Sequence, residues 1–68
     1  MHQILKTLRK QAGMTQAQLA EASGLNRVTI ARYELGTIVP NFDSAVKLAK
    51  ALGVTLEQLA GEEAKTSA

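Results

Sequence analysis

The sequence of 68 residues has no cysteine and no tryptophan, and it contains one proline, one tyrosine and one phenylalanine. Without cysteine, disulfide bonds, thiolate nucleophiles and thiolate-bound zinc are excluded. No apolar run approaches the ~20 residues of a membrane-spanning helix. No stretch alternates apolar and polar residues, so nothing predicts a β-strand. A chain this short forms one domain and has no room for a large substrate pocket beside its core.

Charge is distributed unevenly along the chain, although the net charge is only +2. Residues 1–36 contain five basic and two acidic side chains, whereas residues 37–68 contain three basic and four acidic ones. The N-terminal half is therefore the half to examine for a polyanionic partner. A bias this mild is also common in proteins that never bind nucleic acid, so it does not identify a partner by itself.

Apolar periodicity and capping residues predict five short helices. The expected helices cover about residues 3–12, 16–23, 27–35 and 42–52, and a last one of one or two turns follows residue 55. Their N-caps, from the second helix onward, are Thr15, Asn26, Asn41 and Thr55. Thr15 and Thr55 are each followed three residues later by glutamine, which is the spacing of a capping box. A glycine follows each of the first four helices, as expected at a helix C-terminus.

The apolar faces of these helices predict one core in an all-α domain of five helices, covering residues 1–60. The expected core residues are Leu5, Leu8, Leu19, Ala20, Ile30, Val46, Ala49, Leu52, Leu56 and Leu59. The fourth helix has a wide apolar face that also includes Phe42, Ala45 and Leu48, so we expect it to be well buried. Tyr33 is expected in the core. Residues 61–68 are polar or small and are expected to form a flexible tail.

The second and third helices are separated only by Gly24, Leu25 and Asn26. A turn of three to four residues that contains glycine, placed between two short helices, predicts a helix-turn-helix unit. Ile30, Tyr33 and Glu34 lie at helical spacing and would face the other helices.

The opposite face of the third helix carries no acidic residue and would suit a DNA major groove. Its members are Arg27, Val28, Ala31 and Arg32. Arginine can donate two hydrogen bonds to guanine O6 and N7, and small apolar side chains can contact the thymine methyl group. These four residues are the predicted base-reading positions. The alternative is that both arginines are ordinary solvated charges.

The N-terminus of the second helix would present free backbone N–H groups to a phosphate. Gln16, at its first position, could add a side-chain hydrogen bond to the same strand. The predicted phosphate-contacting residues are Thr15, Gln16 and Asn26. Phosphate contacts of this kind set the register in which the third helix reads bases.

The segment from residue 8 to residue 59 resembles the Cro/cI-type helix-turn-helix family, also called the xenobiotic-response-element family, which includes phage repressors, restriction-modification controllers and antitoxins. The resemblance covers more than three-quarters of the chain and implies a lambda-repressor-like fold. The matching pieces are Leu8-Arg9, Gly13, Thr15-Gln16, Leu19-Ala20, Gly24, Ile30, Tyr33-Glu34, Gly36, Pro40, Leu48-Ala49 and Leu52-Gly53-Val54.

The family resemblance implies roles for individual positions. Gln16 corresponds to a phosphate-anchoring glutamine, and Arg27, Val28 and Arg32 correspond to base-reading positions. Arg9 and Glu34 correspond to a buried ion pair between the first and third helices.

The chain departs from the family after the third helix. Many phage repressors have a basic loop there, whereas this chain has Thr37, Ile38 and Val39. This departure indicates an apolar role for Ile38 or Val39, either against the core or in a subunit contact. The candidate dimer contacts are Ile38, Val39 and Leu56.

The function predicted from the sequence is sequence-specific binding of double-stranded DNA by a cytoplasmic transcriptional repressor or regulator. We expect a homodimer on a palindromic operator, because one recognition helix reads too few base pairs for useful specificity. One alternative is an antitoxin that binds a toxin and represses its own operon, and another is a protein-interaction module that reuses the fold. An enzyme is disfavoured, and no metal or organic cofactor is expected, because neither paired carboxylates at a cleft nor a metal-ligand cluster is evident.

Overall fold

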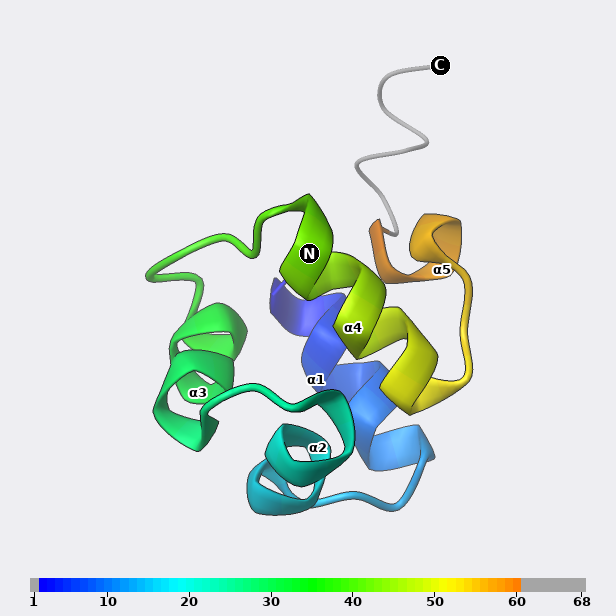
Figure 1. Cartoon of the computed structure of the whole chain (residues 1–68), viewed down its shortest axis with the longest axis horizontal. Helices are drawn as coiled ribbons and strands as arrows, with labels where there is room; N and C mark the ends of the chain where they lie inside the picture. Colours follow the sequence, from blue (N-terminus) through cyan, green and yellow to red (C-terminus); the bar gives the residue numbers. More distant parts are fainter. Residues whose placement is uncertain (1, 61–68) are drawn as a thin grey trace.

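This computed structural model describes residues 2–60, which fold into five α-helices and the connections between them. The helices are α1 (His2–Gln11), α2 (Gln16–Ser23), α3 (Arg27–Leu35), α4 (Phe42–Leu52) and α5 (Leu56–Ala60). No strand occurs within these residues, so the all-α, five-helix prediction is confirmed. In Figure 1, α4 lies in front of α1, and α2, α3 and α5 are arranged around this pair. The tail expected at residues 61–68 lies outside the described residues.

Side chains next to the helix-turn-helix define where α2 and α3 begin. Thr15 Oγ1 accepts a hydrogen bond from the Gln18 backbone N–H at 3.1 Å, and Gln18 Oε1 accepts one from the Thr15 N–H at 2.8 Å. Asn26 Oδ1 accepts from the Val28 N–H at 2.7 Å and caps α3. Gly24, the C-cap of α2, has a φ of 74°, a conformation that glycine adopts without steric strain. The chain can therefore turn from α2 into α3 within three residues.

The predicted caps of the last two helices are also present. Asn41 Oδ1 accepts from the Ser44 N–H at 2.8 Å at the start of α4. Thr55 and Gln58 exchange side-chain-to-backbone hydrogen bonds of 2.9 and 3.0 Å ahead of α5. These contacts satisfy N–H groups that a helix start would otherwise leave without a partner.

Each helix contributes one completely buried side chain to a single core cluster. These side chains are Leu5, Leu19, Ile30, Leu48 and Leu59. Burying a leucine or isoleucine contributes about 1.5–3 kcal/mol relative to leaving it exposed. The core therefore depends on all five helices at once, and the removal of any one of them would expose the rest.

Most of the predicted core residues are buried or pack against the buried cluster. The buried ones are Leu5, Leu19, Ala20, Ile30, Ala49 and Leu59. Those that are partly buried against the cluster are Leu8, Leu52 and Leu56, and Val46 is half-buried. Tyr33, Ala45 and Leu48 complete the cluster.

Phe42 was predicted on the buried face of α4, and this prediction was wrong because its side chain is 75% exposed. Phe42 is the first residue of α4, whereas the buried residues of this helix begin one turn later at Ala45. α4 packs against α2 and α5, and its buried residues are Ala45, Leu48 and Ala49, so the apolar stripe extends at Phe42 past the buried part of the helix.

Candidate nucleic-acid interface

The recognition helix α3 has one buried side and one exposed side. Ile30, Tyr33 and Glu34 are buried, which holds α3 against α1 and α2. Arg27, Val28 and Arg32 are exposed, whereas Ala31 is half-buried and presents less of its side chain than its position on the helix indicated. Val28 leaves 59% of an apolar side chain in water. The structure therefore brings the predicted base-reading residues onto one accessible side of α3.

The polar residues at the starts of α2 and α3 have structural roles of their own. The side-chain oxygens of Thr15 and Asn26 accept the capping hydrogen bonds, which leaves the Thr15 hydroxyl hydrogen and the Asn26 Nδ2 hydrogens as donors. Gln16 is half-buried at the first position of α2. All three residues remain predicted phosphate contacts.

A two-point ion pair joins α1 to α3. Arg9 Nε donates to Glu34 Oε2 at 2.6 Å, and Arg9 Nη2 donates to Glu34 Oε1 at 3.0 Å. Arg9 Nη1 also donates to the backbone carbonyl of Met14 at 2.8 Å, in the connection between α1 and α2. The two side chains are 10% and 4% exposed, so this is a buried pair whose polar groups are well satisfied.

Gln16 extends this network to α2. Its Nε2 donates to Glu34 Oε1 at 3.1 Å, so one carboxylate accepts hydrogen bonds from α1 and from α2. The hydrogen bond between Gln16 and Glu34 was not predicted, because the two residues are 18 positions apart and no local sequence pattern indicates that they meet. It orients the Gln16 carboxamide, because one Nε2 hydrogen is directed at Glu34.

The pKa values of the pair follow from this geometry. Burial raises the pKa of Glu34 and is the largest single influence on it, but hydrogen bonds from Arg9 and Gln16 and the charges of Arg9 and Lys6 together lower it. The hydrogen bond to Glu34 raises the pKa of Arg9 despite burial. Both groups are therefore charged at neutral pH, and the carboxylate acts as a fixed acceptor.

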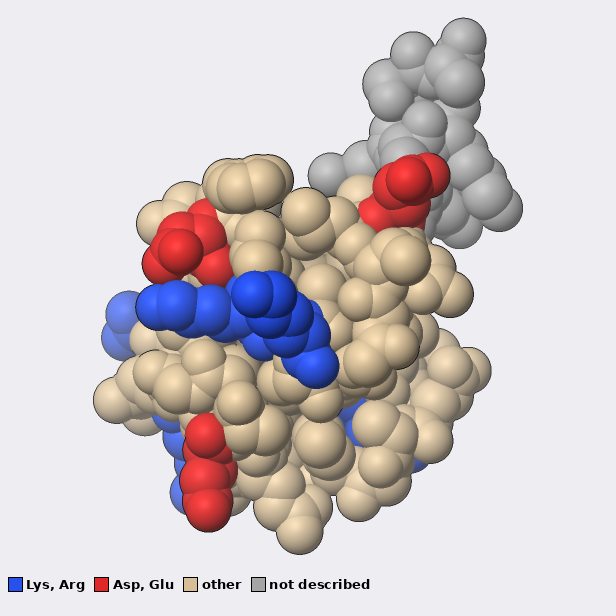
Figure 2. All heavy atoms as spheres, turned by 45° about the vertical axis from the view of Figure 1, so that its right-hand side comes forward, with Lys and Arg blue, Asp and Glu red and all other residues tan. Residues whose placement is uncertain are grey.

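The face formed by α4 and α5 differs in charge from the exposed side of α3. Figure 2 shows a mostly uncharged surface on which a basic group lies beside an acidic one. Lys47 and Asp43, one turn apart on α4, form an ion pair of 3.2 Å. No such pair involves Arg27 or Arg32 and another residue within 2–60. The arginines of α3 are thus better placed to bind an external anion than Lys47.

The described residues contain neither a cluster of metal ligands nor a membrane-spanning helix. No group of three or more histidine, cysteine, aspartate or glutamate side chains within 2–60 could hold a metal ion. None of the helices in that part of the chain is both long enough and apolar enough to cross a membrane.

The comparison with known families agrees with the arrangement of α2 and α3 as a helix-turn-helix. The family model described as Helix-turn-helix matches residues 5–59, which include all five fully buried core residues. The chain belongs to the Cro/cI-type helix-turn-helix family.

Similar proteins in this helix-turn-helix family include two phage repressors. The cryptic phage CTXphi transcriptional repressor RstR of Vibrio cholerae is 35% identical over 57 residues, which are 84% of this chain and 51% of the relative. The immunity repressor protein of Bacillus phage phi105 is 36% identical over 61 residues, or 90% of this chain and 42% of the relative. This chain thus spans about half the length of these two repressors.

Two helix-turn-helix relatives are closer to this chain in length. The uncharacterized HTH-type transcriptional regulator YgzD of Bacillus subtilis is 36% identical over 59 residues, which cover 87% of this chain and 89% of the relative. The crystal structure of the restriction-modification controller protein C.AhdI from Aeromonas hydrophila matches with a TM-score of 0.83 and 34% identity, covering 85% of this chain and 88% of that one. The helix-turn-helix fold is therefore shared by proteins of similar size.

Proposed function

We propose that this chain is a transcriptional regulator that binds double-stranded DNA sequence-specifically, with α3 in the major groove. The observation that carries the proposal is the exposed side of α3, where Arg27, Val28 and Arg32 face solvent. The family and the names of its relatives support the same function, and they favour a regulator over an antitoxin. Such a regulator acts on operator DNA in the cytoplasm.

The chemistry of this side of α3 fits base edges in the major groove. Arg27 and Arg32 can each donate two hydrogen bonds to guanine O6 and N7. Val28 lies between them in sequence, and its exposed methyl groups can contact the methyl group of thymine. The buried residues on the other side of α3 hold these side chains in a fixed register.

Gln16 is proposed to anchor the phosphate backbone. Because Glu34 accepts one of its Nε2 hydrogens, the second Nε2 hydrogen remains as a donor for a phosphate oxygen. The N–H groups at the start of α2 favour an anion at the same end. The hydrogen bond to Glu34 links Gln16 directly to the recognition helix. The phosphate-contacting residue and the base-reading residues are therefore held in a fixed position relative to one another.

We further propose a two-fold homodimer, with recognition helices about 34 Å apart so that both can enter successive major grooves. Val39 and Phe42 are 76% and 75% exposed, and Ile38 is 39% exposed. These apolar side chains lie in the α3–α4 connection and at the start of α4. Leu56 is partly buried against the core and could take part only through its remaining surface. Phe42 is thus a stronger candidate for the subunit contact than Leu56.

The experiment for DNA recognition starts by selecting bound sites from a random duplex pool. Arg27→Ala, Arg32→Ala and Gln16→Ala are then titrated against every single-base variant of the selected site at two salt concentrations. An arginine that reads a guanine should lose about 1–3 kcal/mol of discrimination at one base pair per half-site. Gln16→Ala should weaken all sites to a similar degree, because a phosphate contact carries no sequence information.

Two results would contradict the proposed recognition. One is a pool that yields no preferred sequence. The other is that both arginine variants weaken every operator variant equally and flatten the salt dependence, which would make them backbone contacts.

The dimer is tested by sedimentation of the wild type and of Val39→Ser/Phe42→Ser over a range of concentrations, with circular dichroism to verify that the helices are retained. The wild type should shift from monomer to dimer and the variant should remain monomeric at the same concentrations. A wild type that stays monomeric both free and on a complete operator would exclude the homodimer.

A further inference from the structure

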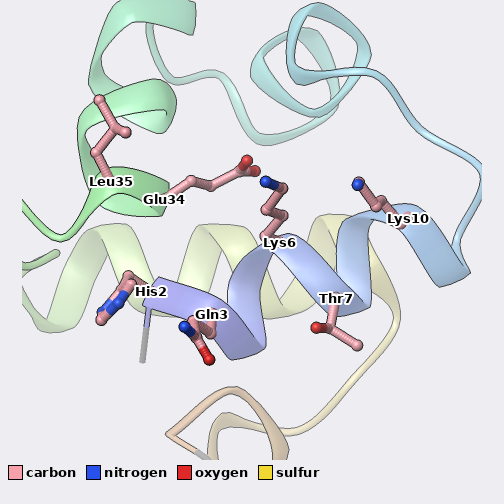
Figure 3. Close-up of a pocket in the computed structure, with 7 residues that line it drawn as sticks. All are labelled: His2, Gln3, Lys6, Thr7, Lys10, Glu34 and Leu35. Carbon is pink, nitrogen blue, oxygen red and sulfur yellow. The ribbon is translucent and has the colours of Figure 1, made fainter.

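A solvent-open hollow of about 460 Å³ lies between α1 and the C-terminal end of α3. Lys6, Thr7 and Lys10 line it from α1, and Glu34 and Leu35 line it from α3. In Figure 3, the Lys6 and Lys10 side chains rise on the same side of α1, and the Glu34 carboxylate is directed toward Lys6. Neither lysine belongs to the proposed base-reading residues or to the proposed phosphate anchor.

The hollow has an excess of positive charge. Its carboxylate, Glu34, is already paired with Arg9 by two hydrogen bonds, so their charges largely offset each other. Lys6 and Lys10 are both exposed, and no ion pair joins either of them to another residue within 2–60. Two lysines one turn apart on a helix repel each other slightly, which an external anion would relieve.

The hollow adjoins the proposed phosphate anchor. Glu34, which lines the hollow, accepts through Oε1 the hydrogen bond from Gln16 at the start of α2. Lys10 is the last basic residue of α1 and precedes the connection that leads into α2. Glu34 therefore connects the hollow that Lys6 and Lys10 line to the residue that is proposed to bind phosphate. An ammonium group on a flexible stem binds phosphate without a fixed geometry, so no further preorganisation is required.

We propose that Lys6 and Lys10 bind the phosphates of the DNA strand that Gln16 contacts, so that α1 extends the DNA interface beyond α2 and α3. This inference rests on the proposed function, because it takes DNA as the anion. It assigns to α1 a share of the affinity and none of the sequence specificity.

The test compares two double variants with the same change in net charge. Lys6→Gln/Lys10→Gln removes the lysines of the hollow, and Lys47→Gln/Lys50→Gln removes two exposed lysines of α4. Binding to the selected operator and to a random duplex is titrated from about 50 to 200 mM salt. Two lost phosphate contacts should flatten the slope of log Kobs against log salt by about 1.8 in the α1 variant, on both duplexes. The α4 variant should keep the wild-type slope.

Phosphate ethylation then locates the contact. On the operator, ethylation of the phosphates that the lysines bind should weaken the wild type and should not weaken Lys6→Gln/Lys10→Gln further. Equal flattening in both double variants would mean that only net charge matters and would overturn the inference, as would an unchanged slope in the α1 variant.

The outcomes of this test separate the inference from the proposed function. If the wild type does not prefer the selected site over the random duplex, sequence-specific recognition fails, while the slope difference on the random duplex still decides the role of α1. If the preference holds and the two slopes are the same, only the inference about α1 fails.

Discussion

Replacing Glu34 with alanine perturbs the hydrogen-bond network that joins α1, α2 and α3. The change removes the acceptor of two hydrogen bonds from Arg9 and one from Gln16. Arg9 would keep only the hydrogen bond from Nη1 to the Met14 carbonyl, and its charge would lie in a site where its side chain is 10% exposed. The main effect should therefore come from the arginine that is left unpaired.

The expected loss from Glu34→Ala is about 3–5 kcal/mol, the usual effect of breaking a buried ion pair by removing one partner. A chain of 68 residues has a total stability of about 3–10 kcal/mol. The loss is therefore about a third or more of the total stability, and it is enough to unfold the variant at 25 °C if the wild type lies at the lower end of this range. The measurement is urea denaturation followed by circular dichroism.

The control for Glu34→Ala is the double variant Arg9→Met/Glu34→Leu, which leaves no buried charge. It should recover most of the lost stability, since apolar replacement of a buried pair is often neutral or stabilising. A loss below about 1 kcal/mol in Glu34→Ala, the value for an exposed pair, would refute the reasoning. So would a double variant that is no more stable than the single one.

Three further predictions concern stability. Because the pKa of Glu34 is lowered, its contribution to stability is present above the ordinary glutamate pKa of 4.5 and is lost as the pH falls through the lowered value. As the pH falls below about 4.5, the urea midpoint should therefore drop more steeply in the wild type than in Glu34→Gln. Leu48→Ala, at a completely buried position, should lower the free energy of unfolding by about 2–5 kcal/mol, and an unchanged melting temperature would contradict the core assignment. Asn26→Ala removes the α3 cap and should lower stability by about 1 kcal/mol, whereas Asn26→Gly should lower it by only a few tenths, and equal losses would argue against the capping role.

The local sequence predicted the helices and their ends, because these depend on residues within one turn of each other. Thr15 and Gln18 meet because a helix start brings positions three apart together, and Gly24 permits the left-handed turn into α3. Apolar spacing also predicted which side of each helix faces the core, since apolar residues spaced at the helical period lie on one side of the helix. The resemblance to a known family, read from the same residues, supplied the ion pair of Arg9 with Glu34 and agreed with the base-reading role that helical spacing and side-chain chemistry had given to the exposed side of α3.

Only the tertiary structure decided how these helix faces meet. The exposure of Phe42 depends on where α2 and α5 stop covering α4, and no pattern inside α4 encodes that limit. The hydrogen bond from Gln16 to Glu34 and the position of Lys6 beside the C-terminal end of α3 join residues that are far apart in the chain. Such contacts follow from the packing angles of whole helices, which depend on all core side chains together and not on any local pattern.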